Sequence, residues 1–189
     1  MKQRILEIAK LKGLSHISSC ISALPIYEEI CQIKKPEDKL LVSGAHSHLA
    51  HLVVREKYEG LKNIEDLIDL DIHCNKSAGC DYNGGSLGHA IGIGIGMALV
   101  DKNRDVYVII TDGSFAEGSE MEALRIARQL NLSNLKVYAN FNGFSAVERV
   151  DMDYYERVIS AIGFPVKIFR TSNEEFDGVK GHYETIKSI

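Results

Sequence analysis

The sequence has no tryptophan, only three prolines and only four cysteines among its 189 residues. The cysteines form no C-x-x-C pair, so the motif of thioredoxin-like redox proteins is absent: they are Cys20, Cys31, Cys74 and Cys80. Residues 1–13 alternate charged and apolar side chains and lack the apolar core of a secretory signal peptide. We therefore expect reduced thiols in a cytoplasmic protein.

Long apolar runs and blocks of like charge are also missing. The longest nearly uncharged segment, residues 83–100, contains His89 and six glycines, and its apolar part is too short to span about 30 Å of hydrocarbon. The net charge is −4, from 22 basic and 26 acidic residues, with no basic stripe of the kind that binds nucleic acid. We expect one globular domain over residues 1–189 that binds neither membranes nor nucleic acids.

A zinc site at the cysteines is one alternative for this sequence. Five residues separate Cys74 from Cys80, and His73 comes directly before the first cysteine. Structural zinc sites usually place about two to four residues between paired cysteines. Zinc binding by these three residues is therefore a poor match to the spacing, and we do not favour it.

Apolar residues recur at helical spacing in the first half of the chain. The predicted helices cover residues 1–13, 19–32, 46–59 and 64–70, and a loop through Gly79, Gly84 and Gly85 follows. In the first helix, Leu11 is placed on the apolar side together with Ile5, Ile8 and Ala9. Pro25 is expected near a first turn or a kink of the second helix.

The second half alternates strands and helices. Strands are predicted over residues 106–112, 135–141 and 165–170, and helices over residues 117–132 and 153–164. Short joints between them predict an α/β fold with a parallel sheet and helices on both faces. Right-handed crossovers bring the carboxyl ends of all strands to one edge, where ligands bind in open parallel sheets. The segment 172–178 is expected to be a solvated loop.

Two polar residues follow successive predicted strands, Asp112 and, 30 positions later, Asn142. A carboxylate and an amide oxygen, with a backbone carbonyl nearby, form a ligand set suited to Mg²⁺ or Ca²⁺. Gly113 has no Cβ and would let the backbone approach a phosphate closely. Ordinary turn chemistry explains Asp, Asn and Gly at strand ends equally well, so spacing alone leaves both interpretations open.

Four segments in order extend this pattern: LSHISSCISALPIYEEI (14–30), DKLLVSGAHSHLA (38–50), GCDYNGGSLGHAIGIGIGMAL (79–99) and DGSFAEGSEMEALRIA (112–127). Together with Asn142 they resemble the thiamine-diphosphate signature of the transketolase family, in its N-terminal, diphosphate-binding domain. The last segment is similar to the family pattern Asp-Gly-x-x-x-Glu-Gly-x-x-x-Glu-Ala. Thr111 stands where the family has the first glycine of Gly-Asp-Gly.

The resemblance implies a role for each matching residue at the diphosphate. Asp112 and Asn142 would bind Mg²⁺ through their side chains and Phe144 through its backbone carbonyl. Gly113 would donate its N–H to the diphosphate of thiamine diphosphate, and His46 would line the pocket beside it.

Further matching residues lie near the cofactor ring and the substrate. Gly85 and Leu87 would contact the aminopyrimidine ring. His16, like His46, would line the diphosphate and substrate pocket, and His73 would orient a substrate hydroxyl. Glu117 matches an acid at the subunit interface that takes part in proton communication between two cofactors.

Simpler interpretations compete for some of these positions. His16 is also compatible with a solvated residue at a helix start, and His73 with a plain loop residue. Gly92, Gly94 and Gly96 form a Gly-x-Gly-x-Gly string, but no predicted strand precedes it. We therefore expect this string in a buried helix that packs closely on its neighbours, rather than in a nucleotide-binding loop.

In the transketolase family, a glutamate on a second, pyrimidine-binding domain activates the cofactor, and 189 residues leave no room for that domain. The resemblance thus implies one subunit of a split, heterotetrameric enzyme that transfers a two-carbon ketol unit between sugars, sugar phosphates or other sugar derivatives. The chain alone should be inactive. The family segments that bring another histidine to the pocket are also expected to be missing, which puts the usual sugar-phosphate substrate in doubt.

Two other functions remain open. One is a subunit of a 2-oxo acid decarboxylase, dehydrogenase or acyloin synthase that uses the same cofactor. The other is a non-catalytic relative, which the retention of both Asp112 and Asn142 disfavours.

Overall fold

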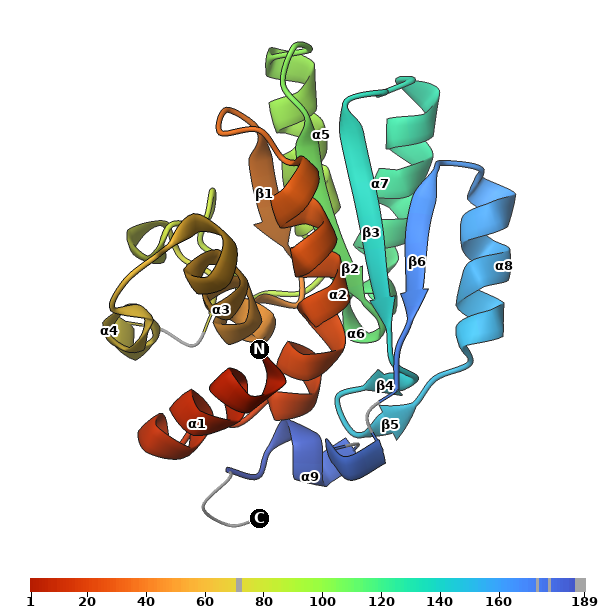
Figure 1. Ribbon diagram of the computed structural model, residues 1–189. Helices are drawn as coiled ribbons and strands as arrows, with labels where there is room; N and C mark the ends of the chain where they lie inside the picture. The colour runs from red at the N-terminus through yellow and green to blue at the C-terminus, as the bar shows by residue number, and fades with distance from the viewer. Residues whose placement is uncertain (71–72, 173, 177, 186–189) are drawn as a thin grey trace.

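A parallel four-stranded sheet forms the centre of the computed structural model, which describes residues 1–70, 73–172, 174–176 and 178–185 (Figure 1). The strand order is β1-β2-β3-β6, and every neighbouring pair is parallel. The strands are β1 (Lys39–Val42), β2 (Val106–Thr111), β3 (Leu135–Phe141) and β6 (Val166–Arg170). The predicted parallel α/β architecture is confirmed.

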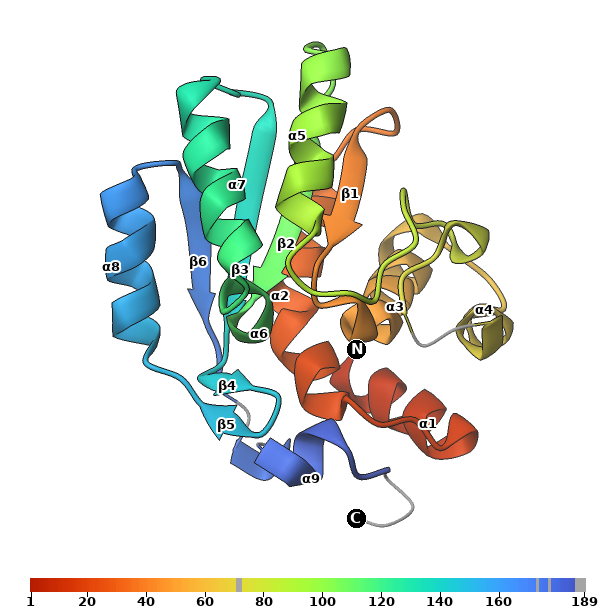
Figure 2. The same cartoon turned by 180° about the vertical axis from the view of Figure 1, so that it is seen from behind.

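Helices cover both faces of this sheet. One face carries α2 (Ile17–Ile33), with α1 (Lys2–Lys12) and α3 (His48–Glu59) beside it. The other face carries α5 (Ala90–Val100), α7 (Gly118–Gln129) and α8 (Met152–Ile162), which lie in front of the sheet in Figure 2. Within the described ranges, no helix has both the length and the apolar character that crossing a membrane requires.

The alternating side chains of β2 explain why two separate cores form. Tyr107 and Ile109 pack with the α1–α2–α3 side, whereas Val106, Val108 and Ile110 pack with α5, α7 and α8. All five are buried, as expected for a parallel strand covered on both faces.

Shorter elements join the main ones: η1 (Ala45–Ser47), α4 (Ile64–Leu70), η2 (Lys76–Ala78), α6 (Asp112–Phe115), β4 (Phe144–Ser145), β5 (Glu148–Arg149), η3 (Glu174–Phe176) and α9 (Gly178–His182). The antiparallel β4–β5 hairpin and α9 lie below the carboxyl ends of the strands in Figure 1. Loops from distant parts of the sequence therefore meet at that edge.

Several details differ from the sequence prediction. Leu11 is 67% exposed, while Ile5, Ile8 and Ala9 are buried as expected. Pro25, expected near a first turn or a kink, lies well inside α2, which excludes the first of these two positions. The segment expected as a solvated loop instead contains η3, whose Phe176 is buried, and its residues 173 and 177 lie outside the described part of the chain.

The glycines of α5 are not equivalent. A Cβ at Gly94 would lie 2.8 Å from Val108 Cγ2 and 3.1 Å from Leu135 Cδ1, so this glycine lets the helix approach the sheet. Gly92 and Gly96 have nothing within 4 Å of such a Cβ and lie on the exposed side. The expectation of close packing is thus correct for Gly94 only.

This difference gives a matched pair of substitutions. Gly94→Ala and Gly92→Ala gain the same helix propensity, about 1 kcal/mol, but only the first forces a methyl group into the core. Gly94→Ala should therefore be less stable than Gly92→Ala by about 1–3 kcal/mol in urea denaturation. Equal free energies of unfolding would contradict the packing role of Gly94.

Candidate functional site

The ends of β2 and β3 are joined by one hydrogen bond. The backbone N–H of Asn142 donates to Oδ2 of Asp112 at 2.7 Å, although the two residues are 30 positions apart. The amide oxygen of Asn142 in turn accepts the N–H of Phe144 at 3.0 Å. The three residues predicted to hold a metal therefore lie at one strand edge.

Local structure explains how Asp112 reaches this position. Thr111 ends β2 with an extended backbone and caps α6: Ser114 N–H donates to Thr111 Oγ1, and Thr111 N–H donates to Ser114 Oγ. A threonine in place of the family glycine is thus compatible with the strand end and adds a capping box. Asp112 is the first residue of this short helix.

Asp112 is buried with an incomplete set of partners. The side chain is 1% exposed, and its Oδ1 atom has no hydrogen-bond partner within the described structure. Burial raises the pKa of Asp112 to about 7, although hydrogen bonds from backbone N–H groups oppose this shift. A buried carboxylate with one unpaired oxygen is suited to a cation, because the cation would stabilise the charged form.

A cavity of about 270 Å³ opens beside Asp112. Its lining includes most of the residues singled out from the sequence: His16, His46, Gly85, Leu87, Asp112, Gly113, Asn142 and Phe144. These come from five separate stretches of the chain. The fold therefore brings the predicted cofactor residues into one pocket.

Three residues that line this pocket have an unusual backbone conformation. Gly85 has φ of 142°, which favours glycine, and His16 and Ala146 adopt the left-handed conformation with φ of 61° and 55°. Left-handed residues other than glycine are uncommon and cluster at functional sites. Their presence at the pocket is consistent with a site built for a ligand.

Three histidine rings meet at one side of the pocket. The ring centroids of His16 and His46 are 4.8 Å apart, and His182 from α9 lies 4.3 Å from His16 and 5.8 Å from His46. Burial, followed by the influence of the neighbouring histidines, lowers the pKa of His16 to about 4 and that of His46 to about 3. These rings are neutral at pH 7.

His182 is a pocket residue that no sequence pattern identified. The backbone N–H of His16 donates to the carbonyl of His182 at 3.1 Å, which ties α9 to the start of α2. The chain therefore brings a third histidine to the pocket, although the family segments that supply another histidine were expected to be missing. The segment GHYE around His182 has no feature that distinguishes it from a solvated turn, so only the tertiary fold identifies it.

His73 and Glu117 do not line this cavity. The ring of His73 lies about 4.0 Å from where a Cβ at Gly85 would be, and its charge contributes to the lowered pKa values of His16 and His46, so it stands beside the pocket. Glu117 is exposed at the N-cap of α7.

A second buried acid lies on α7. Glu120 is fully buried; Ser43 Oγ donates to its Oε1 at 2.9 Å, and its Oε2 has no hydrogen-bond partner in the described structure. Burial raises the pKa of Glu120 to about 7. No sequence pattern pointed to this residue, because its position in α7 looks like any charged helix position.

Comparisons with known proteins identify relatives that cover most of the chain. Residues 2–161 match the family model described as 1-deoxy-D-xylulose-5-phosphate synthase. The chain is 34% identical to human transketolase over 180 residues, which is 80% of this chain and 29% of that protein. It is 29% identical over 155 residues to one subunit of the apulose-4-phosphate transketolase of Phocaeicola vulgatus, covering 71% of this chain and 55% of that relative.

A solved structure supports the same fold. Transketolase from Leishmania mexicana superposes with a TM-score of 0.64 at 18% identity, covering 89% of this chain and 35% of that chain. The chain spans between 26% and 55% of the length of curated relatives such as these. The similarity therefore concerns one region of the larger enzymes.

The raised pKa of Asp112 has a consequence for stability. A carboxyl group whose pKa is higher in the folded state keeps its proton longer there, so its contribution to the free energy of unfolding falls as pH rises from about 4 to about 7. Asp112→Asn cannot ionise. Between about pH 4 and pH 7, the free energy of unfolding of Asp112→Asn should therefore increase by about 2–4 kcal/mol relative to that of the original protein.

Urea denaturation at several pH values, without divalent cations, measures this difference. Comparing the two proteins cancels the opposite contribution of the buried histidines, whose lowered pKa values stabilise the fold as pH rises. A difference that stays constant with pH would show that burial does not perturb Asp112.

Proposed function

The chain belongs to the transketolase-like family of thiamine-diphosphate N-terminal domains, and on that premise we propose that it is the diphosphate-binding subunit of a split transketolase-like enzyme. It would transfer a two-carbon ketol unit between sugars or sugar derivatives. The observation that supports this proposal most directly is the buried Asp112, with its unpaired Oδ1, hydrogen-bonded to Asn142 across two strand ends.

The residues at this edge fit a Mg²⁺–diphosphate group. Asp112, the amide oxygen of Asn142 and the carbonyl of Phe144 supply hard oxygen ligands, and Gly113 brings a backbone N–H without a Cβ. A Cβ there would meet Ser145 Oγ at 3.4 Å and Leu87 Cδ1 at 3.5 Å. Gly85 and Leu87 line the side on which the cofactor ring would lie.

Thiamine diphosphate, when bound, supplies a carbon nucleophile and stores the resulting carbanion. The histidines of this chain would act on the substrate. Because His16 and His46 are neutral, they would form hydrogen bonds with hydroxyl and carbonyl groups rather than attract a phosphate by charge. His182, whose pKa burial also lowers, extends this hydrogen-bonding wall, which is suited to a polyhydroxylated substrate.

A partner chain is supported by α5, which contains no charged or polar side chain in its sequence AIGIGIGMALV. Its outer side exposes Ile93 (38%), Leu99 (45%) and Val100 (89%). An apolar helix is normally buried all round. We propose that this side packs against a second subunit, which carries the activating glutamate and completes a heterotetramer. The relative from Phocaeicola vulgatus, which is itself named as one subunit of a transketolase, supports such a division.

A 2-oxo acid-dependent synthase is the second candidate, because the matching family model is named for a synthase rather than for transketolase. Activity assays of the assembled complex with ketose donors and with 2-oxo acids distinguish the two reactions.

Calorimetric titration of thiamine diphosphate and Mg²⁺ into the protein with its partner tests the cofactor site. Asp112→Ala should abolish Mg²⁺-dependent binding, because it removes the carboxylate while leaving the fold intact. Asp153→Ala, on the exposed surface of α8, is the control and should bind as the original protein does. Unchanged binding by Asp112→Ala would refute this site.

Two substitutions to lysine at similarly exposed positions test the partner surface. Leu99→Lys lies in the last turn of α5, and Ile33→Lys lies in the last turn of α2 on the other side of the sheet, with similar exposure of 45% and 49%. Only Leu99→Lys should weaken assembly with the partner, by at least about tenfold in analytical ultracentrifugation, because a buried charge without a partner is costly. Equal effects of both substitutions, or none, would contradict the proposed surface.

A further inference from the structure

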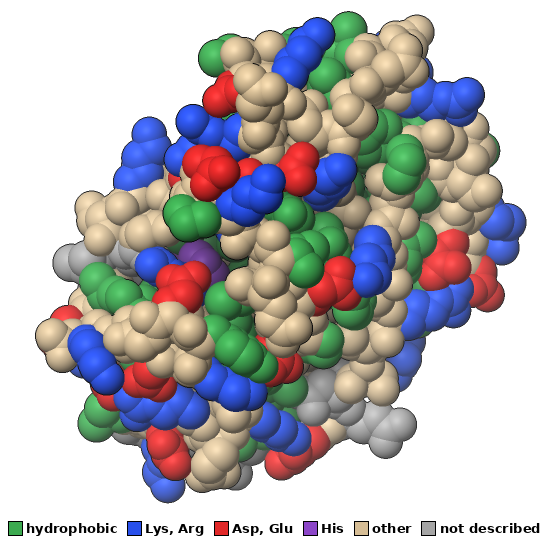
Figure 3. Space-filling model, turned by 45° about the horizontal axis from the view of Figure 1, so that its top comes forward, with side chains coloured by type: hydrophobic (Ala, Val, Ile, Leu, Met, Phe, Trp, Pro, Cys, Tyr) green, Lys and Arg blue, Asp and Glu red, His purple; other side chains and the backbone are tan. Residues whose placement is uncertain are grey.

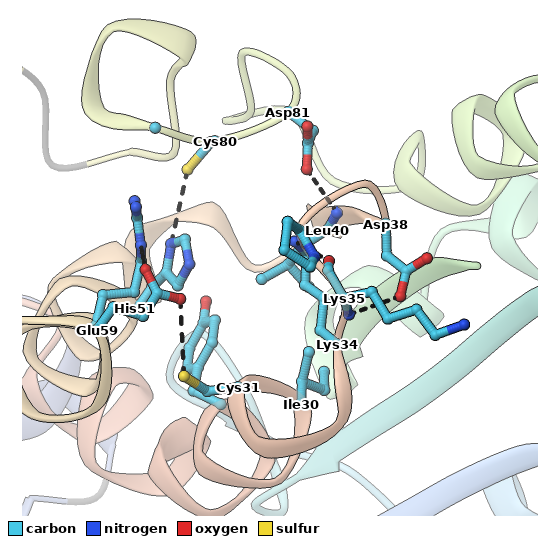
Figure 4. A pocket seen from close by; sticks show the side chains of 14 residues that line it. Ile30, Cys31, Lys34, Lys35, Asp38, Leu40, His51, Glu59, Cys80 and Asp81 are labelled. Carbon is cyan, nitrogen blue, oxygen red and sulfur yellow. Dashed lines mark hydrogen bonds and ion pairs between the residues drawn. The ribbon is translucent and has the colours of Figure 1, made fainter. Parts of the chain in front are cut away.

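A second cluster of reactive side chains lies away from the cofactor pocket, on the α3 side of the sheet. His48 and His51 are on the first turn of α3, and Cys74 and Cys80 come from the loop before α5. Cys74 Sγ is 3.6 Å and Cys80 Sγ is 3.5 Å from His48 Nδ1, and Cys80 Sγ is 3.9 Å from His51 Nδ1. Figure 4 shows His51 and Cys80 facing one another.

These distances match a metal site. Zinc bonds of about 2.3 Å to sulfur and about 2.0 Å to nitrogen place tetrahedral sulfur and nitrogen ligands about 3.6 Å apart. Both thiols lie at this distance from His48 Nδ1, and the donor atoms of His48, Cys74 and Cys80 all lie within 4.8 Å of one another. His51 lies outside this trio, with its Nδ1 atom 3.9 Å from Cys80 Sγ, and would be the fourth donor.

Burial also favours a ligand role. His48 is fully buried, Cys74 is 1% exposed and His51 is 9% exposed. The Nε2 atom of His48 has no hydrogen-bond partner in the described structure. A buried polar atom without a partner lowers the stability of the fold, so an apolar residue at this position would be more stable if packing were its only role. Two cysteines and two histidines are a set typical of structural zinc.

We propose that His48, His51, Cys74 and Cys80 bind one Zn²⁺ ion. Both thiols would lose their protons to solvent on binding, and the two thiolates would balance the charge of the ion without any redox change. The sequence alternative paired Cys74 and Cys80 with His73, which stands instead beside Gly85 at the cofactor pocket. The histidines that complete the set lie more than twenty residues upstream.

A route to the site exists. A cavity of about 520 Å³ is lined by Tyr27, Cys31, His51, Arg55, Glu59 and Cys80, so two of the proposed ligands form part of its wall (Figure 4). On the face drawn in Figure 3, acidic and basic side chains are interspersed, and a histidine is visible in a hollow between them. Such an opening gives a metal ion access to an otherwise buried site.

The ion would fasten the loop of residues 73–85 to α3. Backbone bonds already link this loop to the pocket: Cys74 N–H donates to the carbonyl of Ala45, next to His46, and Gly84 N–H donates to the carbonyl of Cys74. Holding Cys74 and Cys80 would therefore hold His73, Gly85 and His46 in place. This consequence, unlike the metal site itself, rests on the proposed function.

The test begins with the full chain purified under reducing conditions. Elemental analysis should find about one zinc per chain, and the chelated protein should bind Co²⁺ with a thiolate-to-metal charge-transfer band. Cys80→Ser should weaken Zn²⁺ binding at least about a hundredfold, because it removes one thiolate ligand. Cys31→Ser, which changes another cysteine of the same cavity, should leave Zn²⁺ binding unchanged.

Three results would overturn the proposal: no zinc and no Co²⁺ band in the original protein, a Cys74–Cys80 disulfide in thiol counting, or equal loss of zinc in Cys31→Ser. The Co²⁺ band of the original protein decides the matter even if Cys80→Ser does not fold. Asp112→Asn separates the two sites, because it should lose cofactor binding and retain zinc. Absent zinc with intact cofactor binding would therefore refute this site alone.

Discussion

The structure depends on one buried carboxylate. The N–H of Asn142 at the end of β3 donates to Asp112 at the end of β2, so this hydrogen bond links the two strand ends just beyond their last paired residues. Only one of the two Asp112 oxygens is used in this way. Leaving a buried acid half satisfied costs stability, and such a group persists where the remaining oxygen serves a ligand. The pocket, the hairpin that follows β3 and the start of α6 all adjoin this group.

The loop before α5 connects this pocket to the cysteine–histidine cluster. His73 and Cys74 are neighbours in the chain, yet the histidine stands beside Gly85 and the cysteine contacts His48. Adjacent residues of an extended segment point in opposite directions. One short stretch would therefore serve both the proposed cofactor pocket and the proposed metal site, and α3 supports both because η1, directly before it, carries His46.

Sequence patterns predicted the alternating strands and helices of the second half of the chain. They missed the features that depend on contacts between segments far apart in the sequence. Strands β2 and β3 were predicted because they are long and apolar. β1 was missed because it has only four residues between polar neighbours, and it pairs with β2 rather than with any strand near it in the chain. His182 and Glu120 were missed for a related reason. Their surroundings come from distant elements, so no local spacing distinguishes them from exposed helix and turn residues.

The charges of the pocket bear on the proposal that it binds a cation together with a diphosphate. Burial raises the pKa of Asp112 to about 7 and lowers the pKa values of His16 and His46, so desolvation disfavours every charged form among these three groups. A diphosphate alone would find little positive charge there, and a divalent cation alone would have only one carboxylate. Together the cation and the diphosphate largely neutralise each other, and the carboxylate, the amide and the backbone N–H groups of the strand ends then suffice to hold the pair. A pocket of this kind would, on the proposed function, favour a metal-bound diphosphate over either ion by itself.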